Sequence, residues 1–169
     1  MMPQAPTDTQ ILLARLAALL LAGFTMVSLL WHGISPEGYD RVWRNIAERP
    51  GGPMTFRFVL QPGMAAIAAL NDGIWDARSG RSPYFWTLLT SPSDRRGRLG
   101  EGLISTAHIV LLGLGIDTIY QLTVLNTFYP GEAVIITLLL VVIPYVLLRG
   151  PFTRIARWWI ARSPLSRTE

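Results

Sequence analysis

The feature that most constrains this chain is an uncharged apolar run near its carboxyl-terminal end. Residues 133–148 contain no charged side chain, and only Thr137 and Pro144 interrupt the apolar sequence. With the three residues that precede it, the run approaches the roughly 20 residues that a helix needs to cross a hydrocarbon layer of about 30 Å. It therefore predicts a transmembrane helix.

A second apolar stretch, residues 102–124, precedes this run and is separated from it by a short turn at residues 125–129. Residues 101–149 are therefore expected to form a transmembrane helical hairpin. A third stretch, residues 11–31, is also long enough to span, with Arg15 able to snorkel at one end and Trp31 at the other end as an interfacial anchor. Residues 1–31 are thus predicted to be an amino-terminal tail and a first transmembrane helix.

The arginine-rich segment 32–100 lies between these apolar parts. Tyr39, Val42, Trp43 and Ile46 recur at helical spacing, which predicts an amphipathic helix on the membrane surface. Residues 54–76 are interrupted by polar groups and Pro62, which suits a re-entrant or interfacial helix better than a full crossing.

Charge distribution decides between the two topologies that this segment allows. It contains nine of the fifteen arginines, and the positive-inside rule places such a segment in the cytoplasm. This favours three transmembrane helices with cytoplasmic-side amphipathic helices, and the alternative is four transmembrane helices with 54–76 crossing. The hairpin turn has no basic residue and the tail 150–169 is basic and aromatic, so we expect the turn outside and the carboxyl terminus in the cytoplasm.

Composition narrows the class of protein further. Half of the residues are hydrophobic and lie in long runs, which predicts an all-α integral membrane protein. Every basic residue other than histidine is arginine, a usage that suggests a bacterial origin and hence a multi-pass protein of the inner membrane. The chain has no cysteine and no lysine, which excludes disulfides, thiolate chemistry and a lysine Schiff base. No catalytic motif is present, and we expect no cofactor, no metal and no nucleic-acid partner.

Two polar residues in the first arm of the hairpin are candidates for function. Asp117 shares a helix face with Gly113 and Gln121, so it is either a proton or cation site or a carboxylate that reaches interfacial water. His108 lies nine residues away, on the opposite face, where it is either a ligand or a hydrogen-bonded contact between helices.

Two further groups of charged residues lie outside the predicted spans. Asp72 and Asp76 are one helical turn apart, and they either hold a divalent cation or form a surface ion-pair cluster with Arg78 and Arg81. A basic and aromatic set is expected to contact lipid headgroups. This set is Arg95, Arg96, Arg98, Arg154, Arg157, Trp158 and Trp159. The alternative for its first three members is a phosphorylated ligand.

Several motifs resemble a family of small uncharacterised inner-membrane proteins of proteobacteria. They are Gln61-Pro62, Asp72-Gly73 with Asp76-Ala77-Arg78, Pro83-Tyr84-Phe85-Trp86 and Tyr129-Pro130-Gly131-Glu132. The resemblance covers roughly residues 54–157. It implies an inner-membrane location and a shared hairpin architecture, and it brings no established activity.

The sequence leaves three functional hypotheses. The first is a non-enzymatic accessory, scaffold or assembly partner of a membrane complex, because the chain has few intramembrane polar groups and is too small to enclose a pathway alone. The second is an oligomeric channel or transporter lined by Asp117 and His108. The third is a membrane enzyme acting on lipid or on a phosphorylated substrate. Expected partners are anionic membrane lipids and other membrane subunits, or further copies of this chain.

Overall fold

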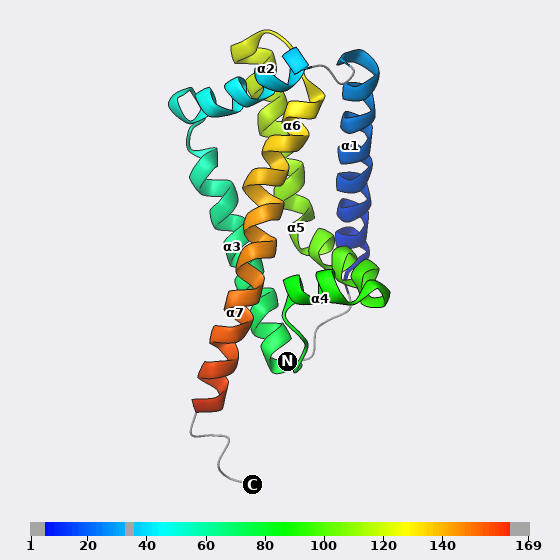
Figure 1. The fold of residues 1–169 in the computed structure, drawn as a ribbon, viewed down its shortest axis with the longest axis vertical. Coiled ribbons are helices and arrows are strands. Elements are labelled where there is room, and N and C mark those ends of the chain that lie inside the picture. Colours follow the sequence, from blue (N-terminus) through cyan, green and yellow to red (C-terminus); the bar gives the residue numbers. More distant parts are fainter. Residues whose placement is uncertain (1–5, 33–35, 163–169) are drawn as a thin grey trace.

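The computed structural model describes residues 6–32 and 36–162, which form a helical bundle without any strand (Figure 1). In chain order the elements are α1 (Asp8–His32), α2 (Pro36–Glu48), the 3₁₀ turn η1 (Arg49–Gly51), α3 (Arg57–Arg78), α4 (Tyr84–Thr90), α5 (Pro92–Tyr120), the π-helical turn η2 (Gln121–Leu125), α6 (Pro130–Thr137), the π-helical turn η3 (Leu138–Val142) and α7 (Ile143–Arg162).

Within the described ranges, three continuous helical stretches are long and apolar enough to cross a membrane. They are Asp8–Trp31, Pro92–Leu125 and Pro130–Arg162. The prediction of an all-α chain with three such helices is therefore confirmed. Both arms of the hairpin extend beyond the predicted 101–149, because α5 already begins at Pro92 and α7 continues to Arg162. The wide turn η3 directly precedes Pro144, whose missing N–H interrupts the regular helical hydrogen bonding.

The hairpin closes through a short turn after η2. Asn126 adopts the left-handed conformation with φ of 51°, which asparagine tolerates better than most residues with a side chain. On α1, the small residues Ala14 and Ala17 are buried, whereas Leu12, Leu19 and Leu30 are exposed. This helix packs on α5 and α6, and Phe24 meets Phe128 edge to face, with ring centroids 5.6 Å apart. Small residues thus let α1 approach the hairpin closely.

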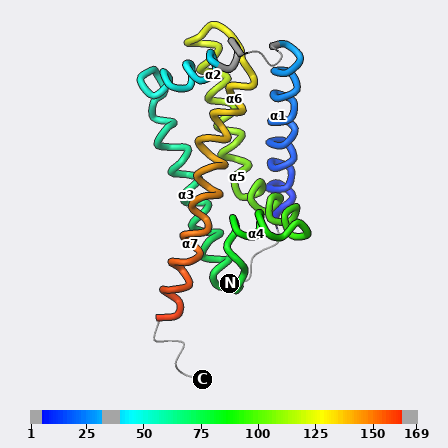
Figure 2. Tube along the Cα trace, in the orientation of Figure 1, coloured from blue at the N-terminus to red at the C-terminus, as the bar shows by residue number. Residues whose placement is uncertain are grey.

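Helix α3 lies alongside α7 over much of its length, as the traces in Figure 1 and Figure 2 show. Its buried face consists of polar residues at both ends and small residues between them: Arg57, Gln61, Ala65, Ala69, Gly73 and Asp76. Ile67 and Leu70, on the apolar face, are exposed. A Cβ on Gly73 would lie 2.9 Å from Cβ of Phe152 and 3.1 Å from the carbonyl oxygen of Arg149, so this glycine permits the closest approach of α3 to α7.

The two ends of the bundle carry different elements. The turn end holds the α5–α6 turn, α2, η1 and the start of α3 (Figure 2). The arginine end holds the carboxyl-terminal turns of α3, with α4, the start of α5 and the last turns of α7. The segment 32–100, which we expected to form one cytoplasmic-side unit, is therefore divided between the two ends, and α3 connects its halves.

Candidate functional site

Most of the buried charges gather in two clusters, one at each end of the bundle. The turn-end cluster comprises Asn45, Arg49, Arg57, Asp117, Gln121 and Glu132. The arginine-end cluster comprises Asp72, Asp76, Arg98, Glu101, Tyr145 and Arg149. Each joins helices that are distant in the sequence, so each is a product of tertiary packing.

Asp117 is the centre of the turn-end cluster and is fully buried. Its Oδ1 accepts hydrogen bonds from Nη1 of Arg49 and, at 2.6 Å, from Nη1 of Arg57. Its Oδ2 accepts one from Nε2 of Gln121 at 2.7 Å. The predicted shared face of Asp117 and Gln121 is thus observed. The carboxylate does not reach interfacial water, because two buried guanidinium groups and an amide surround it.

Glu132, at the start of α6, extends this cluster to α2. One of its oxygens accepts a hydrogen bond from Nη2 of Arg49 at 2.9 Å, and Nδ2 of Asn45 lies 3.0 and 3.1 Å from the two oxygens. Gln121 also bridges the hairpin turn, donating to the carbonyl of Tyr129 at 3.1 Å and accepting from its N–H at 2.5 Å. The cluster therefore connects α2, η1 and the start of α3 to the hairpin turn.

Asp76 is the centre of the arginine-end cluster and is also fully buried. Arg149 donates to both of its oxygens, through Nε at 2.8 Å and Nη2 at 3.1 Å, and Nη1 of Arg98 donates at 2.8 Å. Asp72 accepts a hydrogen bond from the hydroxyl of Tyr145 at 2.5 Å and lies 3.5 Å from Arg149. Glu101 lies 2.9 Å from Arg81, 3.3 Å from Arg98 and 3.6 Å from Arg149.

The expected ion pairs of Asp72 and Asp76 are thus found, but with other partners. The sequence pointed to Arg78 and Arg81, which are close along the chain. The structure instead uses Arg98 of α5 and Arg149 of α7. The reason is that the buried face of α3 points at α5 and α7, whereas Arg81 follows the helix and pairs with Glu101.

Arg98 also corrects the predicted set of lipid-headgroup contacts. Its side chain is only 8% exposed and is bound to Asp76, so it is not available to a membrane surface. Tyr84 is likewise buried and donates its hydroxyl hydrogen to the carbonyl of Arg98 at 2.9 Å. Arg95 and Arg96 are exposed, as the prediction requires.

The predicted tail residues lie on the last turns of α7. Arg154, Trp158 and Trp159 are exposed, and the two indoles meet edge to face. Arg157 is half-buried and donates a hydrogen bond to the carbonyl of Arg81. Lipid contact by these side chains remains a prediction, and Arg157 also has a structural role between α7 and the loop after α3.

His108 is exposed and lies far from the turn-end cluster. It borders two pockets beside α3 and α5, in both cases together with Asp72. Asp117 is buried on the other face of α5, so the structure does not bring these two candidates together. Among the residues that the structure describes, no group of three or more His, Asp or Glu side chains is arranged to hold a metal ion.

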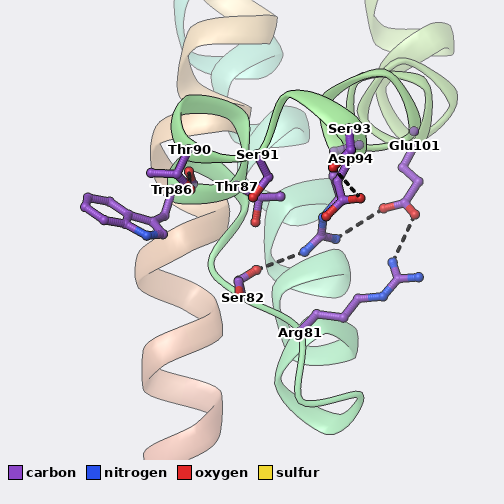
Figure 3. A pocket seen from close by; sticks show the side chains of 11 residues that line it. Arg81, Ser82, Trp86, Thr87, Thr90, Ser91, Ser93, Asp94 and Glu101 are labelled. Atoms are coloured by element: carbon purple, nitrogen blue, oxygen red, sulfur yellow. Dashed lines mark hydrogen bonds and ion pairs between the residues drawn. The ribbon is translucent and has the colours of Figure 1, made fainter.

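A polar pocket of about 680 Å³ lies at the arginine end, between α4 and the first turns of α5 (Figure 3). Its lining is rich in hydroxyl groups from Ser82, Thr87, Thr90, Ser91 and Ser93. Figure 3 shows Arg81 and Glu101 meeting at one edge of the pocket. The two arginines that line the pocket, Arg81 and Arg98, both pair with Glu101, so each already has a counter-charge.

Sequence reasoning missed Arg49, Arg57, Glu132, Tyr145 and Arg149 as parts of these clusters. One signal was present: Asp117 and Glu132 are acidic residues at the two sides of a hairpin turn that has no basic residue, so their counter-charges had to come from elsewhere in the chain. No protein-family model, no curated protein and no solved structure matches this chain.

Proposed function

We propose that this chain is a multi-pass protein of the bacterial inner membrane with four crossings, of which α3 is the additional one. We further propose that it serves as a non-enzymatic accessory or assembly partner of a membrane complex. The topology and the role rest on different observations.

The arrangement of α3 supports its crossing. Its 22 residues correspond to about 33 Å of helix, which matches a hydrocarbon layer of about 30 Å. Arg57 binds Asp117 at the turn end, and Asp76 binds Arg149 at the arginine end. Between these residues the apolar side chains of Ile67 and Leu70 face outward and small residues face inward. This is the pattern of a helix that packs against other helices within lipid.

The charge of each end supports the orientation. At the turn end, Arg41, Arg44, Arg49 and Arg57 stand against five acidic residues: Glu37, Asp40, Glu48, Asp117 and Glu132. The arginine end carries nine arginines of the described chain: Arg78, Arg81, Arg95, Arg96, Arg98, Arg149, Arg154, Arg157 and Arg162. Placing the arginine end in the cytoplasm thus satisfies the positive-inside rule, and the exported turn end has no excess of positive charge.

The absence of cysteine makes the topology directly measurable. Single cysteines at Gly51, Ser79, Ser93 and Thr127 would each be the only thiol in the chain. With four crossings, a membrane-impermeant maleimide labels the positions at Gly51 and Thr127 in intact spheroplasts, and labels those at Ser79 and Ser93 only after permeabilisation. Labelling of Gly51→Cys only after permeabilisation would restore the three-crossing topology.

One observation carries the proposed role: the fully buried carboxylates are already bound by the protein's own groups. Asp76 and Asp117 each bind two arginines, and Glu132 binds Arg49 and Asn45. Carboxylates held in this way connect the helices of the bundle, and their oxygens are occupied by the protein's own donors instead of being open to a substrate cation. These buried carboxylates therefore serve the architecture, as expected of a structural subunit.

Isolation of the tagged protein in a mild detergent tests the role. A second protein that co-purifies at a fixed ratio, measured by native mass spectrometry, is the expected result. The surface variant Arg96→Gln, which removes one exposed positive charge, should retain the same partner. A homo-oligomer without a partner would favour the channel hypothesis, and a monomer alone would overturn the proposal.

A further inference from the structure

Two pockets beside α3 and α5 adjoin each other and share three lining residues, Asp72, Ser105 and His108. The first, of about 470 Å³, contains the charged residues Asp72, Arg81, Glu101 and Arg149. Its other walls come from Trp75, from Ile104 and Ala107 of α5, and from Pro6, Gln10 and Leu13 at and just before the start of α1. The second, of about 380 Å³, adds the apolar residues Met64, Ile67 and Ala68, together with Asn71, to the three shared residues. Together they form one groove with a polar part and an apolar part.

The polarity of this groove follows the direction of α3. Met64, Ile67 and Ala68 lie toward the middle of the helix, and Asp72 follows them in the direction of the arginine end. From Met64 to Asp72 the helix rises about 12 Å. In the proposed topology, this distance is comparable with half the thickness of the hydrocarbon layer, about 15 Å. Along this direction the groove changes from apolar to polar, as one leaflet changes from acyl chains to headgroups. The two changes occur over a similar depth.

The accessible charges in the polar part of the groove indicate the type of lipid headgroup that fits there. Arg149 is 2% exposed at its side chain and is bound to Asp76, whereas Arg81 and Glu101 are exposed at 40% and 39% and Asp72 at 26%. Arg81 and Glu101 pair with each other at 2.9 Å, but such an exposed pair is weak, so the two opposite charges of a zwitterionic headgroup can replace it. Arg81 lies over the indole of Trp75, with its guanidinium carbon 4.1 Å from the ring centre. This arrangement suits a phosphate at Arg81 and a cationic group at Asp72 and Glu101.

We propose that the two pockets form a single binding site for a phospholipid whose headgroup carries an ammonium group, such as phosphatidylethanolamine. The phosphate binds near Arg81, the ammonium binds near Asp72 and Glu101, and an acyl chain lies along Met64, Ile67 and Ala68. The site rests on the proposed membrane topology, because it requires the arginine end of α3 to lie at headgroup depth.

The test is to reconstitute the whole protein in nanodiscs that contain equal amounts of phosphatidylethanolamine and phosphatidylglycerol, and to identify retained lipid by native mass spectrometry. The expected result is one retained lipid per chain, with phosphatidylethanolamine enriched about threefold or more, as two weak exposed ion pairs allow. Equal retention of both lipids, or a preference for phosphatidylglycerol, would overturn the proposal.

Two variants separate the headgroup from the acyl chain. Glu101→Gln removes one carboxylate and should reduce the enrichment, and Ala68→Phe fills the apolar part and should abolish retention. Asp94→Asn, an exposed change outside both pockets, should retain lipid as the unmodified protein does. The unfolding midpoint of each variant in detergent shows whether that variant folds. If one of the two site variants fails to fold, the other still tests the site.

Two further outcomes would overturn the assignment. Retention that is unchanged in both site variants would place the lipid elsewhere, and binding of soluble phosphoethanolamine in place of the lipid would assign the polar pocket to a water-soluble ligand. The cysteine labelling described above is independent of lipid retention. A protein with four crossings but no retained lipid therefore refutes this inference alone, whereas labelling that shows three crossings refutes the topology on which it depends.

Discussion

The guanidinium of Arg149 on α7 donates hydrogen bonds to both carboxylate oxygens of Asp76 on α3, at 2.8 and 3.1 Å, across 73 positions of sequence. Arg98 on α5 adds a third hydrogen bond to the same carboxylate. One buried carboxylate thus joins three helices. A bidentate arginine pair also fixes orientation, so this contact sets how α3 and α7 are aligned as well as how close they lie.

Asp76→Asn should therefore destabilise the protein strongly, because it leaves two buried guanidinium groups with only the more distant and partly exposed Asp72 and Glu101 as counter-charges. Removing one partner of a buried ion pair typically costs about 3–5 kcal/mol. The measurement is equilibrium unfolding in mixed detergent micelles, followed by circular dichroism. The matched change Asp94→Asn, at an exposed carboxylate on α5, should leave the unfolding midpoint unchanged. Equal midpoints for the two variants would show that the Asp76 cluster contributes nothing to stability.

A comparison of Arg98 with Arg96 tests the correction to the headgroup set. Arg98→Gln removes hydrogen bonds to a buried carboxylate and should cost about 1.5–3 kcal/mol, as expected for hydrogen bonds to charged groups. Arg96→Gln changes an exposed side chain and should alter stability by less than about 0.5 kcal/mol. If the two variants unfold alike while both lose association with anionic vesicles, Arg98 contacts lipid after all.

Asp117→Asn should also be destabilising, and a second substitution should partly reverse the effect. Arg49 keeps an ion pair with Glu132, whereas Asp117 is the one ion-pair partner of Arg57 within the described residues. Adding Arg57→Leu to Asp117→Asn removes the uncompensated charge, so the double variant should unfold at a higher midpoint than Asp117→Asn alone. Asp40→Asn, an exposed change at the same end, is the control. A double variant less stable than either single variant would contradict this pairing.

Two glycines of α3 provide a matched pair for the contact between α3 and α7. Gly73→Ala places a methyl group 2.9 Å from Cβ of Phe152 and should destabilise the bundle by about 1–3 kcal/mol, as overpacking usually does. Gly63→Ala meets nothing within 4 Å and should stabilise the same helix by about 0.5–1 kcal/mol through its higher helix propensity. Thermal unfolding in detergent distinguishes them, and a stabilising Gly73→Ala would show that α3 and α7 are less closely packed.

The sequence by itself determined the features that depend on local composition. The apolar runs identified α1 and both arms of the hairpin, because the length and hydrophobicity of a span are properties of one continuous segment. Helical spacing placed Asp117 and Gln121 on one face, and the hydrogen bond between them, at 2.7 Å, follows from that spacing. The same spacing identified α2.

Only the tertiary structure decided which charges meet. Asp76 pairs with Arg149, and Asp117 with Arg57 at a separation of 60 positions, because close packing sets the register of α3 against α5 and α7. The composition of α3 suggested a surface helix, since its charges were counted without their partners. Arg57 and Asp76 are paired inside the bundle, and the exposed residues of α3 include the apolar Ile67 and Leu70 as well as Asn71 and Arg78. The cost of a charge in a membrane protein depends on what lies beside it in space, and a linear sequence does not contain that information.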